Sequence, residues 1–168
     1  AHVPFKRADV VHNFGSFPSP LPGRYLILSE QQGAGNCLAW IKDKIFHERP
    51  EMNHAEKSAS AYRFMDQLVE KAPAGANRLI FTPWLYGERT PVDDCWIRAS
   101  LFNLSLENNR EDILRAVFEG VAFNSRWLLE PMEKFIGRPF AYLNFIGGGA
   151  NSDIWAQIFA DVLNRKIR

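Results

Sequence analysis

The fold is decided by the stretch Asn144-Phe145-Ile146-Gly147-Gly148-Gly149-Ala150-Asn151-Ser152-Asp153-Ile154-Trp155. A short apolar run breaks into three glycines and continues as an amphipathic segment, which predicts a strand, a glycine turn and a helix. Because glycine has no Cβ, a ligand can approach the backbone at such a turn, and the helix that follows offers unpaired N–H groups in its first turn. The stretch is therefore a candidate nucleotide site. A plain structural connection is the alternative, since tight turns need glycine in any case.

Composition places the chain among ordinary globular domains. Its 168 residues are 46% hydrophobic and 13% aromatic, which suffices for one hydrophobic core. The formal charge of +1 comes from 20 basic and 19 acidic residues that are mixed along the chain. Such a balance creates no field that would attract nucleic acid or an anionic membrane, so we expect neither as a partner.

The cysteines and the apolar runs indicate where the protein works. Cys37 and Cys95 lie far apart and outside any CxxC pattern, which favours neither a disulfide framework nor a zinc site. No apolar run approaches the roughly 18 residues of a membrane helix, and the first residues do not resemble a signal peptide. A cytoplasmic location is the prediction.

Both ends of the chain suggest a piece of a longer protein. The sequence opens at Ala1 without a methionine, and it closes at Arg165-Lys166-Ile167-Arg168, where a helix gives way to what looks like a new strand. We therefore expect a domain that is truncated at both ends.

Hydrophobic periodicity predicts alternating strands and helices after a strand-rich start. Residues 1–23 are rich in proline and glycine and predict a loop with one edge strand near Val10-Val11, and residues 48–57 predict a connection. The predicted strands are 24–30, 79–82, 96–104 and 142–146, and the predicted helices are 34–46, 58–72, a long helix capped by Asn109, and 152–164. This order indicates an α/β fold.

The long helix carries three informative residues. Asn109 with Asp112 three positions later is a helix-capping pattern. Gly120 costs about 1 kcal/mol against alanine inside a helix, so the close approach of another backbone is the expected compensation. Pro131 lacks an amide hydrogen and is expected to kink or end the helix.

Two further segments are candidates for function. Gly87-Glu88-Arg89-Thr90-Pro91 lies in a stiff loop dense in polar groups, which is how sites are presented on a scaffold. The alternative is that Glu88 and Arg89 pair with surface partners. Gly35 stands at the start of the 34–46 helix, where it either packs closely on a neighbour or leaves room for a ligand; from the residues alone, packing is the favoured interpretation.

Three motifs in order resemble the C-terminal domain of the FGGY family of carbohydrate kinases, and the likeness is closest to xylulokinases. They are Gly87-Glu88-Arg89-Thr90-Pro91, then Ala116-Val117-Phe118-Glu119-Gly120-Val121-Ala122, then Gly147 to Gln157, and the resemblance covers essentially all of residues 1–168. It implies an actin-like, ribonuclease-H-like fold. It also implies ATP-dependent phosphorylation of a sugar or polyol in a cleft between two domains, of which residues 1–168 form the nucleotide-binding one.

The same resemblance assigns roles to individual residues. The nucleotide would lie against Gly35, near the phosphates, and against Gly147, Gly148, Gly149, Ala150, Asn151 and Ser152, near adenine and ribose. Glu88, Arg89 and Thr90 would face the substrate cleft. Related glycerol kinases carry a nucleotide-contacting glutamine where this chain has Ala39, so a contact is missing there.

Some parts of such a kinase are not expected in this chain. The aspartate that takes the proton from the sugar hydroxyl and the phosphate loop would precede Ala1, so no catalytic residue and no metal ligand is assigned here. Kinases of this kind use ATP with Mg²⁺. We expect this chain to bind the sugar jointly with an N-terminal kinase domain. The 168-residue chain alone is expected to be inactive. Both a monomer and a homodimer are compatible with the sequence.

Two other interpretations remain open. A non-catalytic nucleotide-binding module of the same superfold would share every feature above. A dinucleotide oxidoreductase is disfavoured, because the pattern Gly147-x-Gly149-x-x-Ser152 lacks the third glycine.

Overall fold

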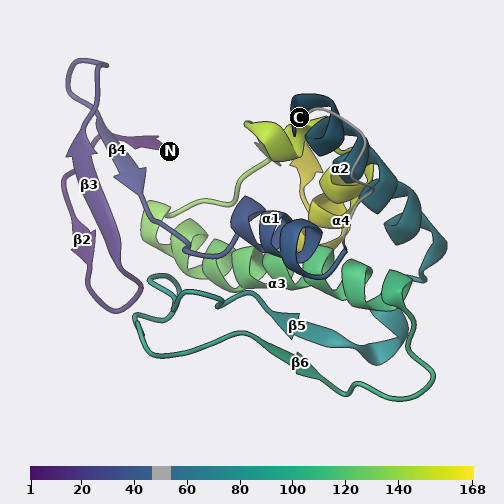
Figure 1. The fold of residues 1–168 in the computed structure, drawn as a ribbon. Helices are drawn as coiled ribbons and strands as arrows, with labels where there is room; N and C mark the ends of the chain where they lie inside the picture. The colour runs from purple at the N-terminus through teal and green to yellow at the C-terminus, as the bar shows by residue number, and fades with distance from the viewer. Residues whose placement is uncertain (47–53) are drawn as a thin grey trace.

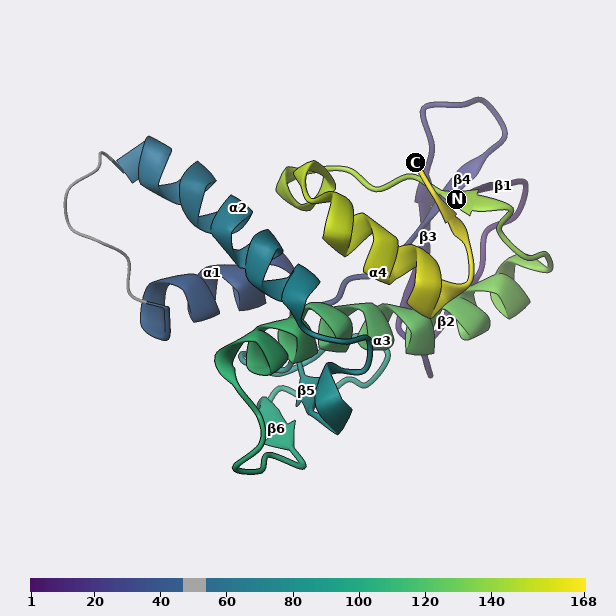
Figure 2. The ribbon, with the colours of Figure 1, turned by 90° about the vertical axis from the view of Figure 1, so that its right-hand side faces the viewer.

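One long helix, α3 (Arg110–Ile136), runs through the middle of the structure, a computed structural model that describes residues 1–46 and 54–168 (Figure 1). Helices α1 (Gly35–Lys44), α2 (His54–Lys71) and α4 (Asp153–Leu163) lie on one side of α3, and strands β5 (Ile80–Thr82) and β6 (Ser100–Phe102) lie on the other (Figures 1 and 2). The mixture of helices and strands confirms the α/β prediction.

The capping residues of α3 confirm the predicted start of the helix. The Asn109 side chain accepts a hydrogen bond from the Asp112 amide, and the Asp112 carboxylate accepts one from the Asn109 amide, which together form a capping box. Gly137 ends the helix in the left-handed conformation with φ of 82°. Pro131 does not end it, because α3 continues to Ile136 and the turns beyond the proline are anchored: Met132 and Phe135 pack against the N-terminal sheet.

Residues 1–28 form an antiparallel sheet, which is more strand than predicted. Its strands are β1 (His2–Val3), β2 (Ala8–Asp9), β3 (Phe14–Pro18) and β4 (Tyr25–Leu28), in the order β1-β4-β3-β2. Val10 and Val11 lie in the turn after β2 with 90% and 77% of their surface exposed, so the strand predicted near them was misplaced. The apolar residues that hold this sheet against α3 are Val3, Phe14 and Ile27.

The helices before β5 follow the predicted pattern. Helix α1 buries Cys37, Leu38 and Ile41. Helix α2 begins at His54, four residues before the predicted start at 58, and residues 48–53 of the predicted connection lie outside the described residues. A short helical turn, η1 (Ala76–Arg78), then leads into β5.

Gly120 brings α3 against the backbone of β5, as predicted. A Cβ on Gly120 would lie 2.2 Å from the carbonyl oxygen of Phe81, so only glycine lets the helix approach the strand this closely. Strand β6 pairs antiparallel with β5 on the side away from the core.

The C-terminal part contains the only parallel pair of strands within the described residues. Strand β7 (Tyr142–Leu143) pairs with β8 (Lys166–Ile167) and is shorter than the predicted strand 142–146. Between them, Gly148 and Gly149 form part of the short helical turn η2 (Gly148–Asn151), and α4 follows this turn as expected. Trp155 of α4 is 3% exposed, and its indole N–H donates to the Phe118 carbonyl of α3, which fixes α4 on the central helix.

Candidate functional site

The three glycines of the turn have three different structural roles. Gly147 has a φ of 90°, a conformation that favours glycine, and a Cβ on Gly149 would lie 2.6 Å from the ring of Trp155. Neither backbone conformation nor close packing requires glycine at position 148, because Gly148 has no such φ and a Cβ there would meet nothing within 4 Å. The backbone is therefore open to a ligand at Gly148, as it is at Gly147, and only at Gly148 does neither φ nor packing require glycine.

The start of α4 is already capped and is acidic. The Ser152 hydroxyl accepts a hydrogen bond from the Trp155 amide at 3.2 Å and donates one to the Asp66 carboxylate at 2.8 Å. Asp153 adds a second carboxylate in the first turn of the helix. Two carboxylates near this helix end disfavour a phosphate, so the turn suits a neutral ligand group such as the base or sugar of a nucleoside.

The carboxyl group of Asp66 has a raised pKa. Burial raises the pKa, the hydrogen bond from Ser152 lowers it, and the charges of Glu70 and Asp153 raise it, with a net upward shift. Because the pKa is higher in the folded than in the unfolded protein, the stability that Asp66 contributes is present at low pH and is lost as the pH rises through the raised value.

The variant Asp66→Asn tests this link between α2 and the turn. An asparagine oxygen can still accept the Ser152 hydrogen bond but does not titrate, so the variant is expected to gain in melting temperature relative to wild type as the pH rises from about 3 to about 7. The same substitution at exposed Asp161 serves as the control. A difference in melting temperature between Asp66→Asn and the wild type that stays constant over this pH range would contradict the raised pKa of Asp66.

The start of α1 is open, in contrast to that of α4. Its N-cap residue is Ala34, no side chain caps the helix, and its first turn contains no acidic residue. A Cβ on Gly35 would meet nothing within 4 Å, so packing, the interpretation favoured from the residues alone, was wrong for this glycine. Gly33 is the packing glycine instead, since its Cβ would lie 2.0 Å from the Pro83 carbonyl oxygen. An uncapped helix start with an open glycine can bind an anion through its N–H groups.

The loop from Gly87 to Pro91 is held by a buried carboxylate. Glu88 is 2% exposed, and its Oε1 accepts hydrogen bonds from the backbone amides of Gln32 and Arg89, both at 2.8 Å. Thr90 is fully buried as well. The alternative in which Glu88 pairs at the surface is therefore wrong, and of the three cleft candidates only Arg89 is exposed, 3.4 Å from Glu30.

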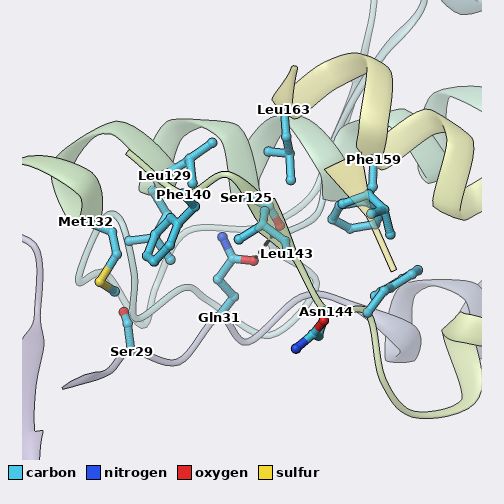
Figure 3. Close-up of a pocket in the computed structure, with 13 residues that line it drawn as sticks. Ser29, Gln31, Ser125, Leu129, Met132, Phe140, Leu143, Asn144, Phe159 and Leu163 are labelled. Atoms are coloured by element: carbon cyan, nitrogen blue, oxygen red, sulfur yellow. Dashed lines mark hydrogen bonds between the residues drawn. The ribbon is translucent and has the colours of Figure 1, made fainter. Parts of the chain in front are cut away.

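A cavity of about 490 Å³ lies elsewhere, between α3, α4 and β7 (Figure 3). Its walls are mostly apolar, and they come from α3, the 140–145 segment and the end of α4. Gln31 reaches into it and accepts a hydrogen bond from Ser125 at 3.0 Å, whereas the Gln31 amide nitrogen and the Ser29 hydroxyl are buried without a partner. None of the predicted site residues lines this cavity.

The structure thus divides the predicted residues into two groups. Gly35 and the segment Gly147–Asn151 are accessible at two turns on the same side of α3, whereas Glu88 and Thr90 are internal (Figures 1 and 2). Sequence reasoning missed Asn124, which binds Glu88; the available signal was a polar residue on the buried face of α3. Among residues 1–46 and 54–168, no group of three or more His, Cys, Asp or Glu side chains could hold a metal ion, and no helix is long and apolar enough to cross a membrane.

Comparison with known proteins gives the same family as the sequence motifs. Residues 7–168 match the model of the C-terminal domain of the FGGY family of carbohydrate kinases. The xylulose kinase of Staphylococcus epidermidis is 31% identical over 93% of this chain, which corresponds to 29% of that enzyme.

Solved structures show the same fold. The crystal structure of xylulose kinase from Rhodospirillum rubrum matches 99% of this chain with a TM-score of 0.80 and 26% identity, and that of gluconate kinase from Lactobacillus acidophilus matches 99% with a TM-score of 0.79 and 27% identity. Each match covers 31% of the other chain, so this chain spans about a third of the length of its relatives. The actin-like, ribonuclease-H-like fold predicted from the sequence is confirmed by these neighbours.

Proposed function

Because this chain belongs to the FGGY family of carbohydrate kinases and matches its C-terminal domain, we propose that it forms the nucleotide side of an ATP-dependent sugar kinase. The reaction would transfer the γ-phosphoryl group of ATP to a hydroxyl group of a sugar or polyol. Xylulose is the first candidate substrate, since xylulose kinases are similar to this chain over most of its length. Residues 1–168 would act as one domain of a longer protein.

The contrast between two helix starts carries this proposal. The start of α1, with Gly35, is uncapped and free of acidic residues, which suits the phosphates of ATP. The start of α4 is capped and acidic, which suits adenine and ribose beside Gly147, Gly148 and the segment 149–152. In the latter segment, Ser152 would act by fixing the turn, because its hydroxyl is already bound to Asp66.

The remaining parts of the reaction would come from outside this domain. Bound ATP with Mg²⁺ supplies the phosphoryl group and the neutralising charge; no acidic cluster in the described residues would hold the metal, so its ligands would be the ATP phosphates and residues of the other domain. The base that accepts the sugar proton is proposed there too. Arg89 is the residue of the 87–91 loop that could reach a substrate. A cytoplasmic location and a homodimer stay predictions.

The variant Gly148→Val in the full-length protein tests the proposed nucleotide turn. A valine side chain would enter the open space beside the backbone, so we expect the KM for ATP to rise about tenfold or more while the KM for xylulose and the melting temperature stay unchanged. The exposed substitution Ala141→Val, outside the turn, is the matched control and is expected to change none of the three values.

Two results would contradict the proposal at different levels. Equal KM values for ATP in the wild type and in Gly148→Val would remove the turn from the nucleotide site. A full-length protein that phosphorylates no pentulose, hexonate or polyol would contradict the kinase itself and favour the non-catalytic nucleotide-binding module.

A further inference from the structure

A single buried carboxylate oxygen joins two segments that are far apart in the sequence. Oε1 of Glu88 accepts hydrogen bonds from the Gln32 amide, just before the 33–35 turn, and from the amides of Arg89 and Thr90, at 2.8, 2.8 and 3.4 Å. The Gln32 amide belongs to the segment that leads into α1, and the Arg89 and Thr90 amides belong to the 87–91 loop. The geometry of this oxygen therefore sets how the two segments lie against each other.

Asn124 fixes the orientation of that carboxylate. Its amide nitrogen donates to Oε2 of Glu88 at 2.6 Å, and its oxygen accepts from the indole N–H of Trp84 at 3.3 Å. Asn124 is 4% exposed and is held on α3. Since Trp84 can only donate, the asparagine oxygen must face Trp84 and its nitrogen must face Glu88.

The start of α1 has two more contacts with the same region, both on the Pro83 carbonyl oxygen. Gly33 packs against it, and the thiol of Cys37 donates to it at 3.4 Å. Burial and then the charge of Glu88 raise the pKa of Cys37 to about 12, so this thiol stays neutral. No thiolate therefore opposes the binding of an anion at the first turn of α1.

A buried charge is costly unless it is fully hydrogen-bonded, and the partners of Glu88 are neutral N–H groups. Neutral donors satisfy the carboxylate without cancelling its charge. Such an arrangement holds backbone segments in one geometry, because moving either segment removes hydrogen bonds from a buried carboxylate.

We propose that Glu88, oriented by Asn124, is a positioning residue that holds the Gly33–Gly35 turn for the phosphates of ATP. The inference rests on the nucleotide site proposed above. It assigns Glu88 to the nucleotide side of the protein, through the backbone of Gln32, although its loop is a candidate for the substrate side.

Replacing Glu88 with glutamine in the full-length protein tests this role. The new amide group would face the amide nitrogen of Asn124, so two donors oppose each other; turning Asn124 around would oppose its nitrogen to the Trp84 donor instead. We expect the KM for ATP to rise about tenfold or more, with a smaller change in kcat at saturating ATP.

The double variant Glu88→Gln with Asn124→Asp is the rescue. Glutamine would donate to the new carboxylate, which also accepts from Trp84, so one negative charge and every donor–acceptor pair are restored. Its KM for ATP is expected to return to within about threefold of wild type. Asn124→Asp alone places two carboxylates at hydrogen-bond distance and is expected to raise the KM at least as much as Glu88→Gln does.

The exposed Glu30, which pairs with Arg89, offers a matched control. Glu30→Gln makes the same chemical change beside the same loop and is expected to leave the KM for ATP unchanged. A lower melting temperature in Glu88→Gln with an unchanged KM for ATP, or a double variant as impaired as Glu88→Gln, would overturn the positioning role. Absence of ATP turnover in the wild type would instead contradict the proposed function.

Discussion

Replacing Gly120 with alanine is expected to lower the free energy of unfolding by about 3 kcal/mol. Alanine is the better helix former by about 1 kcal/mol, yet its methyl group would lie 2.2 Å from the Phe81 carbonyl oxygen, which is backbone and cannot rotate away. Either α3 or β5 must move, and both belong to the main core. Urea denaturation followed by tryptophan fluorescence measures the loss.

Gly35 provides the control for this substitution. It also lies in a helix, but a Cβ there would meet nothing within 4 Å. Gly35→Ala is therefore expected to leave the free energy of unfolding unchanged or slightly higher. If both alanine variants lose the same stability, the close approach of α3 to β5 is not what requires Gly120.

Local chemistry explains why so much of the fold could be predicted. The cap of α3 needs only Asn109 and Asp112, and the close packing at Gly120 follows from the cost of a glycine inside a helix. Helix α4 is similarly determined by its apolar face and by Ser152 at its start. The two helix caps depend on residues within a few positions of one another, whereas at Gly120 the helix context predicts a close approach but not its partner, Phe81.

Features that depend on distant partners were less predictable. Pro131 was expected to interrupt α3, but contacts between the last turns of α3 and the N-terminal sheet maintain the helix. Gly33 and Gly35 look alike in the sequence, and only the position of Pro83 separates the packing glycine from the open one. The burial of Glu88 likewise depends on Asn124, which lies on another element.

The candidate site was likewise predictable in part from the sequence and in part only from the structure. The resemblance identified both glycine segments, but only the structure shows which of their residues are open. It also shows that the two helix starts differ electrostatically, since α1 has no acid in its first turn and α4 has Asp153 with Asp66 beside it. That difference supports the proposal that the phosphates lie at the start of α1 and the nucleoside at the turn before α4, which a count of glycines could not do.

Replacing Arg115 with methionine is expected to be the most destabilising change, at about 3–5 kcal/mol. Arg115 and Glu119 form an ion pair of 2.7 Å with side-chain exposures of 11% and 5%, and Arg115 also donates to the carbonyl groups of Val69 and Ala72 at the end of α2. Without the guanidinium group, the Glu119 carboxylate is left buried beside the Gly75 amide as its remaining donor. Because a domain of this size is stable by only about 5–15 kcal/mol, such a loss would leave little folded protein on warming.

The same helix contains a pair with the same spacing but a different environment. Glu130 and Lys134 are 2.9 Å apart with 74% of each side chain exposed, so Lys134→Met is expected to change the stability by no measurable amount. The double variant Arg115→Met with Glu119→Leu should recover part of the loss, because no unpaired charge remains. Denaturant unfolding of the three variants compares the two pairs directly. Equal effects of Arg115→Met and Lys134→Met on the free energy of unfolding would mean that burial does not govern the contribution of these ion pairs. They would also mean that the hydrogen bonds from Arg115 to the end of α2 do not stabilise the packing of α2 on α3.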